Sequence, residues 1–312
     1  MTLIKTSMLS AIATIIKIIS GFIVTKVIAV YIGPSGLALI GQLQNFVNLV
    51  MLASGNFLRT AITKYTAQYS DDKTRQYELW SSSVKIALGF NIAMFMLLFL
   101  FSKNIADYLF KSTEYEFVLK ILAVSLPFFV LNGMLLAILN GQKQIKKYVT
   151  INILLSIVSL ILVTILSISY GLDGALVAYV TNQSIVFFIT LYYLKNETWF
   201  KMKNFLYKIK YKNIKKLFGF AIITFAAILS SNLSMIYIRD YISETISLVS
   251  AGYWQGIWTL SQVSLTLITT SLATYFLPTL SAMQEKSEIT KELKHAIFII
   301  VPIAMIISLA MY

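Results

Sequence analysis

The chain of 312 residues contains no cysteine and a single histidine, His295. It therefore has no disulfide, no thiolate nucleophile and no Cys- or His-rich metal site. Acidic residues are also scarce, at 13 against 26 Lys and Arg, and charged residues make up only 12% of the chain, about half the share in soluble domains. These absences exclude most catalytic dyads and metal centres. We expect no enzymatic activity, no cofactor and no bound metal.

Long apolar runs dominate what is present. The chain is 58% hydrophobic with a mean hydropathy of +0.77, and a helix of about 20 apolar residues crosses a bilayer. Nine runs meet this length, at roughly 7–32, 37–69, 79–102, 116–140, 149–170, 174–194, 217–240, 253–281 and 295–312. The first is too long for the apolar region of a signal peptide. The sequence therefore predicts an all-α, polytopic membrane protein with nine visible spans.

The loop lysines predict the orientation in the membrane. With the N-terminus in the cytoplasm, most loop Lys and Arg fall on the cytoplasmic side, including eight lysines between residues 195 and 216, while the opposite side holds only Lys103, Lys111 and Arg239. This asymmetry is typical of inner-membrane proteins. The net charge of +13 is therefore interpreted as a topology signal and a source of contacts to lipid headgroups, and no nucleic acid is expected.

The basic segment 195–216 divides the chain. It mixes its lysines with Trp199 and Phe205, which fits either an interfacial helix on anionic lipid or a solvated basic linker. We expect a six-helix lobe at 1–194, this linker at 195–216, and the first three helices of a second lobe at 217–312. The second of two six-helix lobes is then incomplete.

The first two runs contain cations without counter-ions. Lys17 and Lys26 lie in the first run, Arg59 and Lys64 lie in the second, and neither run contains Asp or Glu. A cation at mid-membrane depth costs about 2.5–3.5 kcal/mol and usually faces a protein interior or an aqueous cavity. We hypothesise that the missing counter-ion is an anionic substrate. Alternatively, Lys64 and one of the first two lysines extend to the lipid headgroups.

A diphosphate suits this mixture of cations, because arginine forks two hydrogen bonds onto phosphate and lysine adds a compact charge. Arg239 at the end of the seventh run is a further diphosphate candidate or an ordinary interfacial residue. Gln44, Asn48 and Gln262 lie in two runs rich in polar residues. They would bind sugar hydroxyls or join helix to helix.

Several short motifs resemble a known family. They are GPSGL at 33–37, TKYTAQY at 63–69, YWQG at 253–256 and FLPTLS at 276–281. In this order and spacing they resemble the Wzx-type flippases of lipid-linked oligosaccharides, in particular the O-antigen and enterobacterial common antigen lipid III translocases. These belong to the multidrug/oligosaccharidyl-lipid/polysaccharide exporter superfamily.

The resemblance implies twelve helices in two lobes around a central cavity, working by alternating access in the bacterial inner membrane. The implied substrate is an undecaprenyl-diphosphate-linked oligosaccharide, and a polysaccharide polymerase and a chain-length regulator are implied partners. One alternative is a cation-coupled drug exporter of the same superfamily, for which we would expect an acidic residue in mid-span. Another is a membrane-embedded polymerase or glycosyltransferase, for which we would expect catalytic carboxylates or a large external loop.

Overall fold

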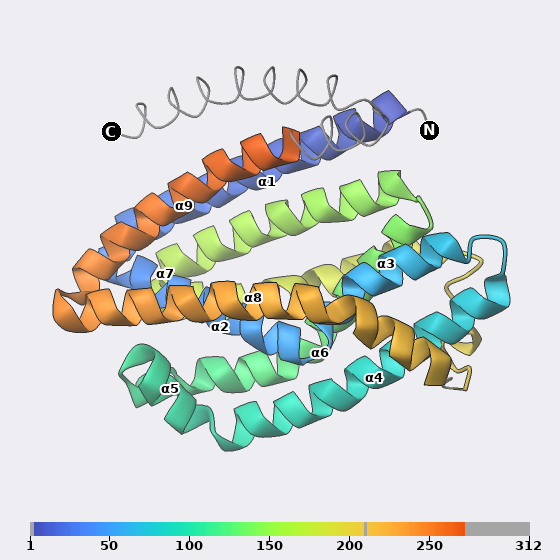
Figure 1. The fold of residues 1–312 in the computed structure, drawn as a ribbon. Coiled ribbons are helices and arrows are strands. Elements are labelled where there is room, and N and C mark those ends of the chain that lie inside the picture. Colours follow the sequence, from blue (N-terminus) through green and yellow to red (C-terminus); the bar gives the residue numbers. More distant parts are fainter. Residues whose placement is uncertain (1–2, 209–210, 272–312) are drawn as a thin grey trace, which may run out of the picture. The chain divides into compact units, whose positions relative to one another are not determined.

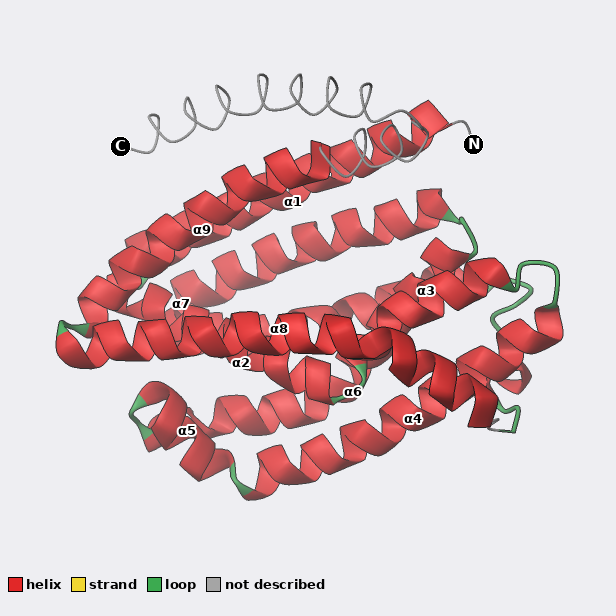
Figure 2. Cartoon of the chain, in the orientation of Figure 1, coloured by secondary structure: helices red, strands yellow, loops and turns green. Residues whose placement is uncertain are grey.

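The computed structural model describes residues 3–208 and 211–271, and this part of the chain is helical with no strand (Figures 1 and 2). Helices satisfy their own backbone hydrogen bonds, as segments surrounded by lipid must. The helices are α1 (Leu3–Tyr31), α2 (Pro34–Ala53), α3 (Arg59–Gln68), α4 (Lys73–Leu100), α5 (Ser102–Phe110), α6 (Glu116–Gly141), α7 (Ile145–Leu194), α8 (Tyr211–Thr245) and α9 (Leu248–Ser271), with 3-10 turns at Asn56–Leu58, Thr113–Tyr115 and Met202–Phe205.

Five helices among the described residues are long and apolar enough to cross a membrane, namely α1, α2, α4, α6 and α7. The 50-residue α7 bends sharply at Gly171, where φ is 57° and ψ is −135°. Each side of this bend is long enough for one span, so a kink at one glycine separates the predicted runs 149–170 and 174–194. The expected spans at 217–240 and 253–281 begin within α8 and α9, and the ninth, at 295–312, lies outside the described residues.

The prediction of one continuous helix over 37–69 is wrong. The chain breaks between α2 and α3 at Gly55, which has a φ of 106° that a residue with a side chain adopts only under strain. Ala87 of α4 lies so close that a Cβ added to Gly55 would be 3.0 Å from the Ala87 Cβ. Asn91 of α4 donates to the Ser54 carbonyl at 2.9 Å, which satisfies a backbone group that the break releases.

The core is centred on α6, which is buried along most of its length and packs against α3, α4, α5 and α7. A helix that is apolar on all sides lies either in a protein core or in a membrane, and α6 lies in the core. Outside this core, α1 packs on α7, and α8 lies along α2 (Figure 1).

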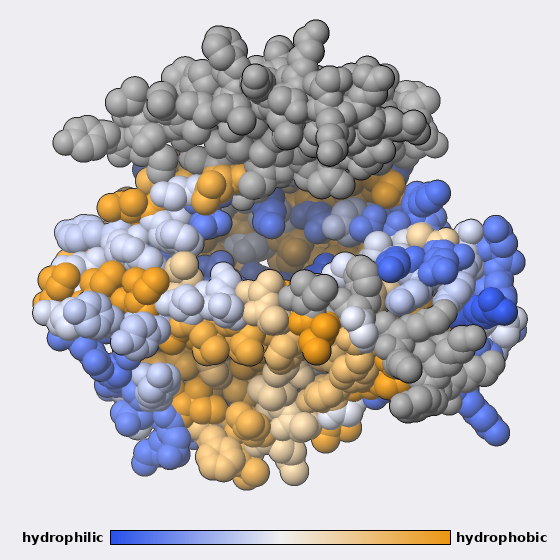
Figure 3. Space-filling model, viewed as in Figure 1, coloured by the Kyte–Doolittle hydropathy of each residue, from blue (hydrophilic) through white to orange (hydrophobic). Residues whose placement is uncertain are grey.

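The surface fits a bilayer. Large apolar side chains are exposed along α1 and along α7, for example Ile15, Ile19, Ile161 and Ile165, whereas soluble monomers rarely expose large apolar patches. Figure 3 shows hydrophobic side chains gathered over the lower middle of one face, with hydrophilic ones toward its left and right ends and in a band above.

The chain forms two compact units, residues 1–253 and 254–312. The first contains α1 to α8 and the start of α9. The second is described as far as Ser271, and in it Trp254 and Trp258 stack with ring centroids 5.8 Å apart. The lobe boundaries at 194 and 216 stay a prediction.

Residues 195–208 form neither of the two structures considered for the basic segment. They hold one short 3-10 turn rather than an interfacial helix, and the buried Trp199 is incompatible with a solvated linker. The segment is instead folded onto the end of α4.

Candidate functional site

Arg59 begins α3 directly after the break at Gly55, and its side chain lies against α6. A Cβ added to Gly133 of α6 would lie 3.1 Å from the Arg59 Cδ and 3.2 Å from both the Arg59 Nε and the Asn56 Oδ1. Glycine at 133 thus makes room for the guanidinium. Within the described part of the chain Arg59 has no carboxylate partner, and the buried Asn56 Oδ1 accepts no hydrogen bond. The structure therefore holds a cation here without an anion.

Polar contacts fix α3 and α7 against α6 beside Arg59. The Thr63 hydroxyl donates to the Ala137 carbonyl at 3.2 Å, and the buried Thr190 hydroxyl of α7 donates to the Asn132 Oδ1 at 2.7 Å. Buried polar groups are costly unless they are paired, so such contacts favour one register between helices. They hold α3, and with it Arg59, in place.

Lys17 and Lys26 are both exposed on α1 and lie on opposite faces, as expected from their spacing. Lys26 lies within the exposed apolar stripe that contains Ile19, Phe22 and Val30. Lys17 shares its face with the buried Ser20 and Ile28. Lys17 is therefore on the side of α1 that faces the bundle, and Lys26 is on the side suited to lipid.

Among the five remaining predicted site residues, Lys64, Gln44 and Gln262 are exposed. Lys64 of α3 lies 5.4 Å from the centroid of the Tyr65 ring. Gln44 of α2 reaches the hydroxyl of Tyr179 on α7. Gln262 is exposed on α9 in the second unit.

Arg239 and Asn48 meet in a polar seam between α2 and α8. Arg239 is only 2% exposed, and its Nη1 donates to the Gln42 Oε1 at 2.8 Å. The side-chain amide of Asn45 is oriented to suit its partners. The amide oxygen of Asn45 accepts from both Arg239 Nη atoms at 3.1 Å, and the amide nitrogen donates to the Asn232 Oδ1 at 3.2 Å. Asn48 donates to the same Asn232 oxygen at 3.2 Å. In this conformation both predicted substrate ligands join helix to helix.

An ion-pair cluster that the sequence analysis did not identify lies beside this seam. Lys111, in left-handed conformation at the end of α5, binds the carboxylates of Asp240 at 3.2 Å and Glu244 at 2.9 Å on α8. The hydrogen bond to Glu244 is the main cause that raises the pKa of Lys111 above its ordinary value. A cavity of about 220 Å³ lies between Lys111, Gln42 and Arg239. In the sequence, the one indication of this cluster was the position of Lys111 on the predicted outer side of the membrane, where lysines are few.

No group of three or more His, Cys, Asp or Glu that could hold a metal ion occurs among residues 3–208 and 211–271. The described residues also place no carboxylate beside Arg59. This arrangement can bind and release an anion by charge and hydrogen bonding.

Helices long and apolar enough to cross a membrane, with an arginine that has no carboxylate partner among the described residues, are the arrangement expected of a membrane transport protein that carries an anion. The chain belongs to the polysaccharide biosynthesis protein family, which matches residues 3–284. It is 29% identical to the Lipid III flippases of Escherichia coli (strain K12) and Shigella flexneri, over 97% of this chain and 73% of each relative. These matches confirm the resemblance seen in the motifs.

The fold is similar to that of a multidrug resistance MATE family transporter of the MOP superfamily in an inward-facing conformation. The TM-score is 0.74 at 17% identity, over 96% of this chain and 68% of that one. At this identity the likeness concerns the fold alone, and it confirms the predicted all-α fold.

Proposed function

We propose that the chain is a flippase that moves undecaprenyl-diphosphate-linked oligosaccharides, such as O-antigen or related repeat units, across the bacterial inner membrane. The observation that carries this proposal is Arg59, a partly buried cation that lies against α6 without a carboxylate partner among the described residues. Family membership and the Lipid III flippase relatives support the same substrate class.

The diphosphate supplies the charge that Arg59 lacks. A guanidinium forks two hydrogen bonds onto phosphate oxygens, and Lys17 on the inward face of α1 adds a second cation. The polyprenyl chain remains in lipid, and the glycan passes along polar side chains such as Gln44. Binding and release suffice for this function, so no covalent bond is made or broken.

Alternating access requires that contacts between the two predicted lobes, residues 1–194 and 217–312, open and close. The polar seam joins α2 of the first lobe to α8 of the second, through Gln42, Asn45 and Asn48 on α2 and Arg239 and Asn232 on α8. Lys111 adds an ionic contact to α8 at the same end. When this seam opens, Arg239 loses its amide partners and becomes a further ligand for the diphosphate.

The orientation and partners complete the proposal. The lysine distribution favours a cytoplasmic N-terminus, which places Lys111 and Arg239 on the periplasmic side. A polysaccharide polymerase and a chain-length regulator are expected partners only through the family resemblance.

A cation-coupled drug exporter is the second candidate, because the fold is shared with a multidrug transporter. Against it, the described spans carry acidic residues only near their ends or bends, such as Glu116 and Asp173. Such an exporter would be expected to bury a carboxylate in mid-span.

Flipping measured in proteoliposomes separates these candidates. The full chain is reconstituted with a fluorescent undecaprenyl-diphosphate oligosaccharide, and lipid that reaches the outer leaflet is detected by an added lectin. We expect transfer of this lipid and no accumulation of a cationic dye under a proton or sodium gradient. Dye transport without lipid transfer would establish the exporter instead.

A further inference from the structure

The basic segment after α7 rests on a buried aromatic cluster. Trp199 is 5% exposed, and its ring centroid lies 5.4 Å from that of Trp80 on α4. Phe205, further along the same segment, stacks on Trp80 with the two ring centroids 6.0 Å apart. Aromatic pairs at these separations add to the stabilisation from burial. Two rings of residues 195–208 are therefore anchored on Trp80 of α4.

Hydrogen bonds fix the backbone of the same segment. The Ser81 hydroxyl donates to the Asn204 carbonyl at 3.2 Å and accepts from the Tyr207 amide at 3.1 Å. Lys85 donates to the Tyr207 carbonyl at 2.8 Å. The lysines of this segment thus project from a fixed framework.

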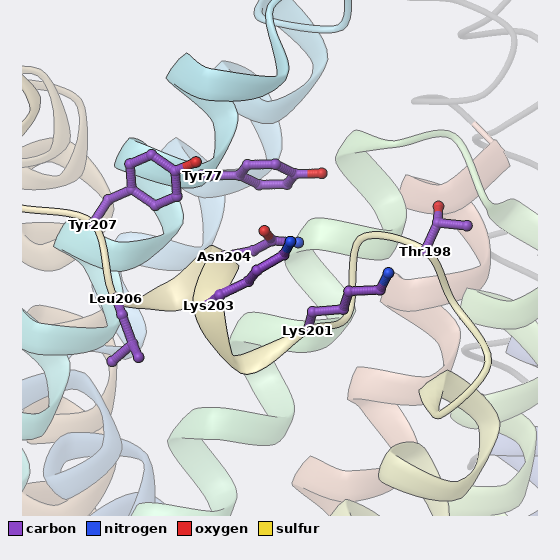
Figure 4. Close-up of a pocket in the computed structure, with 7 residues that line it drawn as sticks. All are labelled: Tyr77, Thr198, Lys201, Lys203, Asn204, Leu206 and Tyr207. Atoms are coloured by element: carbon purple, nitrogen blue, oxygen red, sulfur yellow. The ribbon is translucent and has the colours of Figure 1, made fainter.

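A pocket of about 590 Å³ opens on this framework. Figure 4 shows the amino groups of Lys201 and Lys203 pointing to the same opening as the hydroxyls of Tyr77 and Thr198. The Tyr77 ring is held in place by Trp80, 5.4 Å away between centroids, and by the neighbouring Tyr207 ring at 6.0 Å. This volume is within the range of pockets that bind small ligands.

The charge that the pocket carries is positive. Among the described residues that line it there is no carboxylate, and the acidic residue of the segment, Glu197, already accepts from Gln144 and Trp199 and pairs with Lys147. Among the described residues the side chains of Lys201 and Lys203 have no hydrogen-bond or ion-pair partner. Two ammonium groups that line one pocket, with hydroxyl groups of the same lining, are suited to a phosphate.

We propose that this pocket binds the phosphate group of an anionic membrane lipid in the leaflet that residues 195–208 face. Met202, which lies between the two lysines in the sequence, is 80% exposed, and Leu206, which lines the pocket, is 64% exposed. Such apolar side chains next to basic ones suit the boundary between headgroups and acyl chains. The opening is wide, and a ligand tethered in the membrane compensates for weak binding by its high local concentration. The site is separate from Arg59, and the proposal does not depend on the proposed function.

The test measures lipid binding to the detergent-purified full chain by native mass spectrometry. The probes are phosphatidylglycerol, undecaprenyl diphosphate and phosphatidylcholine, with inorganic phosphate as a soluble competitor. Loss of each lysine weakens binding of an anionic lipid about fivefold, so Lys201→Ala with Lys203→Ala should weaken it about 25-fold. Lys146→Ala with Lys208→Ala removes the same charge from exposed positions outside the pocket and should change binding less than about twofold.

Tyr77→Phe is a second variant that keeps the ring on Trp80 and removes only the hydroxyl. We expect a loss of about two- to tenfold, as for one neutral hydrogen bond. Tighter binding of phosphatidylglycerol identifies a bulk anionic phospholipid as the ligand, and tighter binding of undecaprenyl diphosphate identifies the lipid carrier; each supports a lipid phosphate.

Three results would overturn the proposal. They are equal binding of phosphatidylcholine, unchanged binding in the Lys201 and Lys203 double variant, and displacement of the lipid by inorganic phosphate at an equal concentration. Because the experiment measures lipid binding and not export, its result supports or overturns the lipid-binding proposal independently of the proposed flippase function.

Discussion

Arg59 and Arg239 carry the same charge in opposite surroundings. Arg239 is enclosed by the neutral amides of α2, which accept its hydrogen bonds without adding negative charge. Arg59 lies against a glycine, beside an amide oxygen that accepts no hydrogen bond. The protein's own amides thus already bind the Nη atoms of Arg239, whereas our proposal assigns an anion from outside the protein to Arg59.

Arg59→Ala should reduce glycan export strongly, because a charge-assisted bond to phosphate contributes roughly 1.5–3 kcal/mol, equivalent to about 10- to 150-fold. Arg59→Lys should restore export only in part, since lysine keeps the charge and loses the fork. Export is measured with two unlike repeat units in cells that lack their own flippase, with Arg75→Ala in the exposed α3–α4 region as the control.

Because the diphosphate is common to both substrates, the Arg59 variants should affect the two repeat units about equally, whereas Gln44→Ala should shift the preference between them. Normal export by Arg59→Ala at normal expression would remove Arg59 from the site.

At the scale of elements, two contacts are decided by residues far apart in the chain. The break between α2 and α3 depends on the approach of Ala87 and Asn91 of α4 to Gly55. The contact of α5 with α8 depends on Lys111, Asp240 and Glu244.

Gly55→Ala should destabilise the protein by roughly 1–3 kcal/mol, because it strains a residue at positive φ and crowds Ala87. Gly89→Ala on α4 is the matched control, since a Cβ there meets no atom within 4 Å and alanine favours a helix by roughly 0.5–1 kcal/mol. The measurement is the thermal midpoint followed by tryptophan fluorescence. Equal midpoints for the two variants would contradict a strained break at Gly55.

Lys111→Ala should loosen the contact of α5 with α8. The chain has no cysteine, so a single Ser243→Cys beside the cavity reports its opening through the rate of labelling by an impermeant maleimide. We expect the rate to rise about two- to fivefold, as for exposed ion pairs. Lys103→Ala, also exposed on this side, is the control and should leave the rate unchanged.

The pH dependence follows from the raised pKa of Lys111. A lysine with a raised pKa in the folded state contributes stability below its unfolded pKa and loses it only as the pH rises through the folded value. The ratio of labelling rates between Lys111→Ala and the parent should therefore stay constant from about pH 6 to 8. A ratio that falls to one within this range would contradict the assignment.

At the scale of the whole molecule, the charge asymmetry predicts which side each loop faces. Single cysteines at Asp107, Lys146 and Met202, all exposed, give three reporters in the cysteine-free chain. In intact cells an impermeant maleimide should label only Asp107→Cys, and all three should react after the membrane is opened. Labelling of Met202→Cys from outside would reverse the orientation and would place the lysine pocket in the other leaflet.

The sequence by itself determined the membrane class, the helical fold and the family resemblance. Each depends on properties that add up along the chain, namely continuous apolar runs such as 116–140, their spacing, and short motifs such as residues 33–37. It also identified Arg59 as unusual, because a cation in an apolar run is visible without a structure.

Only the tertiary structure decided the break at Gly55, the amide partners of Arg239, the Lys111 ion pairs and the folding of residues 195–208 onto Trp80. Lys111 and Asp240 are distant in sequence, and Trp199 and Trp80 likewise. The hydropathy of one segment carries no information about which distant side chain will lie against it, since that depends on how all the helices pack together.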